Sequence, residues 1–247
     1  MSIEHPGDLD SMRLVAQITR ETLDALARHV RAGITTGELD AIAAAIFAKH
    51  GARSAPALVY GFPGRVLISI NDEIVHGIPG PRALQRGDLV KLDVTVEKDG
   101  YIADAARSVI VDASSRTARR MVACVEAAFN AAASVARAGT RVNEIGRAVE
   151  REVRRHGFAV VRGLSGHGVG RTIHEEPSVP NQYNAWQRDV LTEGLVLTIE
   201  PMITAGSAEP VTDADGWTIR TRDGSLSAHH EHTLVITRDQ PLILTAA

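Results

Sequence analysis

The chain has 247 residues, enough to bury a substantial core as one large domain or two small ones. Its composition, 44% hydrophobic and 23% charged, is that of an ordinary globular protein. A net charge of −3 gives no electrostatic reason to expect binding to nucleic acid or to an anionic membrane.

The first part of the chain predicts two helices and then short strands. Apolar residues recur at helical spacing over residues 10–30. Thr35 and Glu38 have the spacing of a capping box that opens a second helix, and Gly51 marks its end. Strands are expected at residues 57–60, 65–70 and 74–76, followed by a rigid loop with two prolines and two glycines at 77–81.

A hairpin is predicted next, around the turn Asp99-Gly100, a dipeptide that favours a tight type I′ turn. With these two residues in the turn, Thr95 pairs with Asp104. Asp93 then shares a face with Thr95 and becomes the diagonal neighbour of Asp104, about 7–8 Å away between backbones. Two carboxylates in an apolar sheet repel each other unless a positive group lies between them. On this segment alone, a hairpin with two solvated aspartates remains the alternative.

The second part of the chain resembles the first. Helices are expected at residues 116–137 and 142–156. Residues 30–51 match residues 136–157 at an offset of 106, and the strand ending at Asp93 matches the strand ending at Glu200 at an offset of 107. Chance similarity between amphipathic helices is the alternative, but the near-constant offset favours a duplicated α/β half. We therefore expect a single catalytic domain over residues 1–247, with halves at approximately 10–115 and 116–240.

Further acids and histidines lie in the second part. Glu200 ends an apolar strand, where a carboxylate is costly to bury without a cation, and Glu231 precedes the predicted strand 234–237. His167 lies between glycines, where backbone can approach a ligand closely, and His174 follows seven residues later. Each residue taken singly has an ordinary interpretation, as a surface acid, a hydrogen-bonded histidine or a glycine loop.

Taken together, these residues suggest a metal site. The set contains four carboxylates and one imidazole: Asp93, Asp104, His167, Glu200 and Glu231. Such donors suit Mn, Fe or Co better than a structural zinc site, which prefers thiolate and imidazole. Four negative charges balance two divalent ions, and a water bridging two such ions loses its proton near neutral pH and attacks a polarised carbonyl.

The motifs closely resemble those of the methionine aminopeptidases, nearly throughout the chain and in order. They are Asn71–Pro79, the Asp93 to Asp104 hairpin, Gly166–Gly170, His174–Pro177, Ile199–Met202 and Glu231–Thr233. The resemblance implies the α/β pita-bread fold, in which two pseudo-twofold-related halves form a central antiparallel sheet flanked by helices. Only 31 residues separate Glu200 from Glu231, which fits the short, bacterial-style type I form.

The same resemblance implies the role of each site residue. Asp93 is expected to hold one metal ion and His167 with Glu200 the other, while Asp104 and Glu231 bridge the two. The implied cofactors are two divalent ions per subunit, Co, Mn or Fe, with Zn as a further candidate. The residues implied in catalysis and substrate binding are Glu200 as base, His174 at the oxyanion, His76 near the substrate amide nitrogen, and Phe62, Ile173 and Trp217 around the methionine side chain.

The implied function is removal of the initiator methionine from nascent proteins with a small second residue, by attack of a metal-bridging water or hydroxide on the methionine carbonyl. The expected partners are nascent N-termini, including chains at the ribosome. We expect a cytoplasmic monomer, because no signal peptide or membrane span is recognisable and the single cysteine, Cys124, fits a reducing compartment as a buried apolar residue. The rivals are a prolidase-like peptidase and a non-enzymatic binding protein of the same fold.

The chain also departs from the family pattern near the expected site. The departures are Pro56, Val59, Ala105, His229 and His230, and the last two stand where the family usually has glutamine and an aromatic residue. None of them removes a predicted metal ligand. They bear on metal affinity and on the rim of the substrate pocket.

Overall fold

The computed structural model describes residues 1–112 and 115–246. The helices are α1 (Pro6–His29), α2 (Thr36–His50), α3 (Ala55–Tyr60), α4 (Arg116–Ala133) and α5 (Val142–His156). The strands of the first part are β1 (Arg53–Ser54), β2 (Leu67–Ile70), β3 (Glu73–Val75), β4 (Leu89–Lys98) and β5 (Tyr101–Ile110). The strands of the second part are β6 (Ala159–Val160), β7 (Ser165–Gly168), β8 (Glu175–Pro180), β9 (Val196–Ile199), β10 (Met202–Thr204), β11 (Pro210–Thr212), β12 (Ile219–Thr221), β13 (Ser227–His229), β14 (Glu231–Val235) and β15 (Leu242–Ile243).

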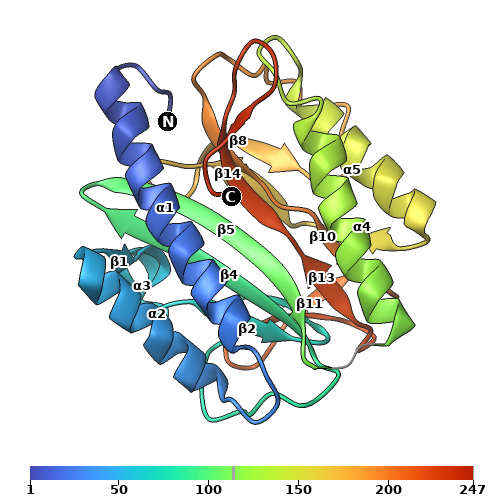
Figure 1. Ribbon diagram of the computed structural model, residues 1–247. Coiled ribbons are helices and arrows are strands. Elements are labelled where there is room, and N and C mark those ends of the chain that lie inside the picture. Colours follow the sequence, from blue (N-terminus) through green and yellow to red (C-terminus); the bar gives the residue numbers. More distant parts are fainter. Residues whose placement is uncertain (113–114, 247) are drawn as a thin grey trace.

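A nine-stranded antiparallel sheet forms the centre of the molecule (Figure 1). Its strand order is β1-β4-β5-β14-β9-β7-β8, with β2 paired to β4 and β15 to β14. The hairpin β4–β5 from the first part of the chain therefore pairs with β14 from the second part, and β9 lies on the other side of β14. Two smaller sheets, β13-β10-β6 and β11-β12-β3, complete the strand pairing. Among the described residues, no helix is long and apolar enough to cross a membrane.

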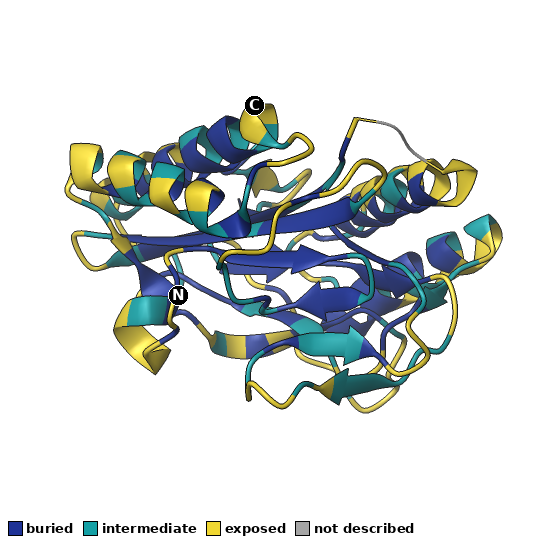
Figure 2. Ribbon diagram, turned by 90° about the horizontal axis from the view of Figure 1, so that it is seen from below, coloured by how far each residue is buried: buried dark blue, intermediate teal, exposed yellow. Residues whose placement is uncertain are grey.

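The four long helices lie on one face of the sheet, with their exposed sides turned to solvent (Figure 2). Leu92, Val94 and Val96 of β4 are completely buried in a core cluster with Met12 and Val15 of α1. Because side chains alternate along a strand, the polar residues between these apolar ones face the opposite side of the sheet. The helices thus bury one face of the sheet and leave the other for polar side chains.

Local signals placed most helix ends correctly. The Thr35 hydroxyl accepts a hydrogen bond from the Glu38 amide, and the Glu38 carboxylate accepts one from the Thr35 amide, so the predicted capping box is present. Gly51 and Gly157 end α2 and α5 with φ of 59° and 79°, a conformation that glycine adopts at low cost.

The predicted strand at residues 57–60 is wrong. This segment is the short helix α3, and its N-terminus is capped by the Ser54 hydroxyl, which accepts from the Ala57 amide. Pro56 lies in the first turn, where the missing amide is not needed, and Gly61 ends the helix with φ of 72°. Three helix-end signals outweigh the strand preference of Val59 and Tyr60. The other predicted elements are present, with ends shifted by a few residues.

The expected antiparallel sheet flanked by helices is observed. Cys124 is buried, and this burial raises the pKa of its thiol to about 12, which fits the predicted apolar role. The derivation of the chain from two duplicated halves, and its description as one catalytic domain, remain predictions.

Candidate metal centre

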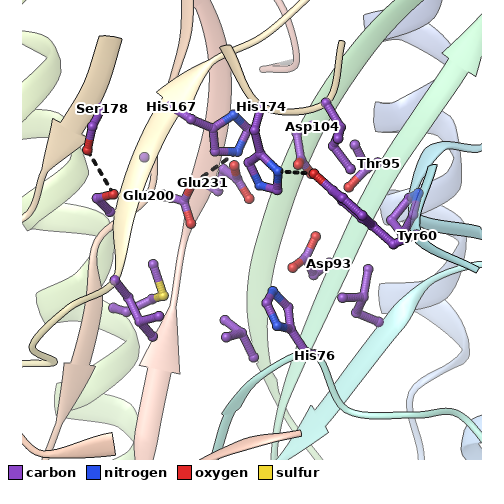
Figure 3. Close-up of a pocket in the computed structure, with 18 of the residues that line it drawn as sticks. Tyr60, His76, Asp93, Thr95, Asp104, His167, His174, Ser178, Glu200 and Glu231 are labelled. Atoms are coloured by element: carbon purple, nitrogen blue, oxygen red, sulfur yellow. Dashed lines mark hydrogen bonds and ion pairs between the residues drawn. The ribbon is translucent and has the colours of Figure 1, made fainter. Parts of the chain in front are cut away.

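A cavity of about 550 Å³ opens on the face of the sheet that the helices leave uncovered. Every residue predicted for the site lines this cavity: Phe62, His76, Asp93, Asp104, His167, Ile173, His174, Glu200, Trp217 and Glu231. Figure 3 shows the carboxylates and histidines among them pointing toward one another from several different strands. The structure therefore brings together residues that lie up to 169 positions apart in the sequence, from Phe62 to Glu231.

The β4–β5 hairpin has the predicted register, with Thr95 opposite Asp104. Asp99 and Gly100 have φ of 50° and 81°, and positive values at both central residues are typical of a type I′ turn. Asp93 consequently lies on the same face as Thr95 and diagonal to Asp104, as expected.

Strand pairing brings Glu231 to the same place. Ala106 of β5 pairs with Asp93 of β4 on one side and with Glu231 of β14 on the other, so these two acids flank a single small residue. The Thr233 hydroxyl donates to the Asp104 carbonyl and accepts from the Asp104 amide, both at 2.8 Å, and this locks β14 to β5. Glu231 was predicted to precede the strand, whereas β14 begins with it.

Glu200 and His167 complete the cluster from the β9 side. Glu200 follows the last residue of β9, and its carboxylate accepts a hydrogen bond from the Thr198 hydroxyl at 3.1 Å. The same hydroxyl accepts from the His167 amide at 3.2 Å, so one threonine positions both residues. His167 Nε2 lies 3.4 Å from Glu200 Oε1.

The four acids repel one another in a buried setting. Burial raises the pKa of the Asp104 carboxyl to about 6. Burial, together with the neighbouring carboxylates, raises the pKa of Asp93, Glu200 and Glu231 well above ordinary values. Among the described residues, no lysine or arginine forms an ion pair with any of the four. The cluster thus lacks the positive charge that would compensate it.

The donor set fits divalent metal ions. Asp104 Oδ1 and Glu231 Oε1 are buried and have no hydrogen-bond partner, which is expensive unless a ligand compensates them. Donor atoms of Asp104, His167 and Glu231 lie within 4.8 Å of one another, and so do donor atoms of Asp93, His229 and Glu231. Carboxylate oxygens with imidazole nitrogen suit ions such as Mn, Fe and Co.

His167 is prepared for such a role. Its Nδ1 lies 2.9 Å from the Gly168 carbonyl, which can only accept, so Nδ1 carries the proton and Nε2 keeps its lone pair. Burial, and the neighbouring His174, lower the pKa of His167 to about 4, so the ring is neutral at pH 7. A neutral imidazole whose free nitrogen faces carboxylates is a competent metal ligand.

Comparison with known proteins supports a metallopeptidase site. The sequence profile of metallopeptidase family M24 matches residues 10–238. The chain belongs to metallopeptidase family M24. It is 38% identical to "Methionine aminopeptidase 2" of Bacillus subtilis (strain 168), over 99% of both chains. It is 40% identical to "Methionine aminopeptidase" of Escherichia coli (strain K12), over 99% of this chain and 94% of that protein.

Solved structures place this M24 chain among the same relatives. The crystal structure of methionine aminopeptidase from Rickettsia prowazekii superposes with a TM-score of 0.95 at 36% identity, over all of both chains. Prolidase from Pyrococcus furiosus has a TM-score of 0.79 at 21% identity, over 98% of this chain but 65% of that one, and shows a shared fold only. The predicted pita-bread fold, the resemblance to methionine aminopeptidases and the assignment to metal-dependent hydrolases are thereby confirmed.

His174 and His76 lie on the cavity side of the M24 site. The rings of His174 and His167 are 4.3 Å apart between centroids, and burial lowers the pKa of His174. His76 follows β3 with φ of 62°, an unusual value for a residue with a Cβ. Such backbone strain persists where surrounding contacts enforce it, and it is common at functional sites.

An apolar wall closes one side of the cavity. Phe62 and Trp217 meet edge to face, with ring centroids 5.3 Å apart. Ile173 and Met202 also line the cavity and are almost fully buried. This wall offers an apolar side chain a surface to bury, next to the polar centre.

Sequence reasoning missed Tyr60, whose hydroxyl lies 2.6 Å from His174 Nδ1. The error in secondary structure at residues 57–60 hid this residue, because its direction depends on helix α3. His229 was noted only as a departure from the family pattern, yet it lies among the carboxylates.

The glycines beside His167 permit close strand packing. An ideal Cβ on Gly166 would lie 2.5 Å from the Thr198 carbonyl, and one on Gly168 would lie 2.3 Å from the Glu176 carbonyl. The predicted approach of a ligand to this backbone stays a prediction.

Proposed function

We propose that this M24 chain removes N-terminal methionine from peptides and proteins whose second residue is small. The proposal is supported by 38–40% identity to proteins named methionine aminopeptidase over nearly the whole chain. The observation that carries it is the cluster of four buried, uncompensated carboxylates beside an apolar-walled cavity. The substrates in the cell would be nascent N-termini in the cytoplasm.

The carboxylates and one histidine are the proposed metal ligands. Asp93 would hold one ion, His167 with Glu200 the other, and Asp104 with Glu231 both. Divalent ions bound there, Mn, Fe or Co, would supply a water of lowered pKa as the nucleophile and polarise the scissile carbonyl. The charge of two such ions balances four carboxylates, which would otherwise repel one another in the buried cluster.

Three further residues of this chain would handle protons and charge. Glu200 lines the cavity with a raised pKa, which suits a general base that accepts a proton from the attacking water. His174 would donate from Nε2 to the oxyanion in the tautomer in which the Tyr60 hydroxyl, 2.6 Å away, donates to Nδ1. His76 would contact the substrate near its amide nitrogen.

The apolar wall is the proposed pocket for the methionine side chain. Phe62, Ile173 and Trp217 offer aromatic and aliphatic surface to an unbranched thioether, which gains mainly from apolar burial and from sulfur–aromatic contact. Discrimination by the second residue of the substrate would depend on the cavity beyond the scissile bond, including Pro56 and Tyr60.

The test is an assay of Met-Ala-, Met-Val- and Xaa-Pro-peptides with purified protein supplied with Mn, Fe or Co. We expect cleavage of Met-Ala-peptides with at least one of these metals, weaker cleavage of Met-Val-peptides and none of Xaa-Pro-peptides. Preference for Xaa-Pro-peptides would indicate a prolidase-like enzyme, and no cleavage with any metal would favour a binding protein. Asp104→Ala should abolish cleavage while the protein stays folded; wild-type activity in this variant would refute the bridging role.

A further inference from the structure

His229 is a histidine of the buried cluster to which no role has been assigned. It is the last residue of β13, directly after which the chain enters β14, and 1% of its surface is exposed. Ser108 of β5 fixes its backbone, because the Ser108 hydroxyl accepts from the His229 amide at 2.9 Å and donates to its carbonyl at 2.8 Å. The backbone that carries the imidazole is therefore held between β13 and β5.

The imidazole of His229 points at the carboxylates and has no hydrogen bond. Its Nε2 lies 3.7 Å from Glu231 Oε2 and 3.8 Å from Glu200 Oε2, both beyond hydrogen-bond distance. Neither Nδ1 nor Nε2 has a partner among the described residues. A buried, unpartnered ring nitrogen directed at acids is expensive, and it requires a ligand that the protein groups themselves do not provide.

The separations fit donor atoms that share a metal ion. Neighbouring ligand atoms about 2.1 Å from one ion lie about 3.0–3.4 Å from each other in octahedral or tetrahedral geometry. The distance of 3.7 Å from His229 Nε2 to Glu231 Oε2 exceeds this spacing by only about 0.3 Å, and the donor atoms of Asp93, His229 and Glu231 all lie within 4.8 Å of one another. A direct hydrogen bond from Nε2 to either glutamate, at the usual distance of about 2.9–3.2 Å, would instead require the two atoms to approach by a further 0.5–0.9 Å, roughly.

We propose that His229 is a direct nitrogen ligand of the metal ion held by Asp93 and Glu231. This inference rests on the proposed metal centre and deepens it, because each of the two ions then has one imidazole, His229 on one side and His167 on the other. A nitrogen donor in place of water or an amide favours Fe, Co or Zn over Mn at that position.

The neighbouring residue provides a matched control. His230 is a half-buried histidine, whereas His229 is fully buried, and the His230 ring packs against Phe129 and His232, with centroids 5.3 Å and 5.0 Å away, on the helix side of the sheet. His230→Gln therefore removes the same chemical group one position along, away from the carboxylates. His229→Gln introduces the residue type that the family usually has at its position.

The first experiment measures Co²⁺ binding to the metal-free full-length protein by calorimetry. We expect His229→Gln to weaken binding of one ion at least tenfold, since loss of even an outer partner of a ligand costs about ten- to a hundredfold. His230→Gln should bind as the wild type does. Equal affinity of the His229→Gln variant and the wild type for both ions would overturn the proposal.

The second experiment counts histidine ligands by X-ray absorption spectroscopy of the Co²⁺-loaded protein. The wild type should show an average of one histidine per ion, and His167→Ala should retain histidine scattering from His229. Loss of all histidine scattering in His167→Ala would overturn the proposal even if the His229→Gln variant fails to fold. A wild type that binds no Co²⁺ would instead refute the metal centre itself, and with it this inference.

Discussion

The burial of the Asp104 carboxyl without a compensating positive charge predicts that Asp104→Asn makes the metal-free protein more stable at neutral pH. The folded protein holds the Asp104 carboxyl at a pKa of about 6, compared with an ordinary value of 3.8. Its raised pKa means that the folded state favours the protonated carboxyl. The stability that this proton provides is fully present below pH 3.8 and is lost as the pH rises through 6. An asparagine amide is neutral throughout and avoids this loss.

The size of the effect follows from the difference of about two pH units. At 1.36 kcal/mol per unit, ionisation of Asp104 lowers the free energy of unfolding by about 3 kcal/mol at pH 7.5. For a chain of this length, 1 kcal/mol changes the melting temperature by about 2–4 °C. The difference in melting temperature between metal-free Asp104→Asn and the metal-free wild type, compared at the same pH, should therefore increase by roughly 6–12 °C from pH 4 to pH 7.5.

Differential scanning fluorimetry of chelator-treated protein at pH 4, 5, 6 and 7.5 measures this change. Asp99→Asn is the matched control in the same hairpin, because Asp99 has an exposed side chain and asparagine also suits the turn. Adding Mn²⁺ should raise the melting temperature of the wild type at pH 7.5 and have little effect on Asp104→Asn. A difference between Asp104→Asn and the wild type that stays constant across this pH range would refute the reasoning.

Three other changes have defined expectations. Tyr60→Phe should lower kcat about tenfold with little change in KM, because one hydrogen bond to His174 is lost. Leu58→Ala, at an exposed position of the same helix, should leave kcat unchanged. A Tyr60→Phe variant with the kcat of the wild type would count against the role of Tyr60 in orienting His174. Gly166→Ala should lower the free energy of unfolding, measured by urea titration, by about 1–3 kcal/mol, because the added Cβ would meet a backbone carbonyl. Gly80→Ala is the control, because a Cβ there has open space around it. Equal urea midpoints for the Gly166→Ala and Gly80→Ala variants would contradict this packing argument. Lys91 is completely buried, and burial lowers its pKa from 10.5 to about 7. The free energy of unfolding of the metal-loaded wild type should therefore rise between pH 7 and 10.5, and it should rise less in Lys91→Met. If urea unfolding shows the same change of stability with pH in both proteins, Lys91 is not its cause.

Several parts of this protein could be predicted from short segments of sequence. The capping box at Thr35 and Glu38 and the glycine after α2 define helix ends through hydrogen bonds within a few residues. The Asp99-Gly100 turn fixes the register of β4 and β5, and hence the diagonal placement of Asp93 and Asp104, because the length and type of a tight turn determine which residues pair.

The predicted site residues converge on one cavity for a related reason. Acids at strand ends and histidines between glycines are individually ambiguous, but their order along the chain matched a known family, and that order specifies a fold. Their assignment as ligands and catalytic groups is still a proposal, which the metal-binding and peptide assays test.

Contacts between segments far apart in the sequence could not be predicted without the tertiary structure. Helix α3 is defined by local signals at Ser54, Pro56 and Gly61, but the contact of Tyr60 with His174, 114 residues further along the chain, follows only from the tertiary structure. The role of Gly166 in strand packing follows from the approach of β9, which its own neighbours do not reveal.

His229 illustrates the same limit most clearly. Its sequence neighbours identify it only as an unusual residue near Glu231, and strand alternation would place residues 229 and 231 on one face without showing which distant groups they meet. The pairing of β14 with β5 and β9, together with the hydrogen bonds between Ser108 and the His229 backbone, brings the ring to within 3.8 Å of Glu200 and Glu231. Local hydrogen bonds thus determined the helices and the hairpin from the sequence, whereas the composition of the metal centre depends on the register of strands far apart in the chain.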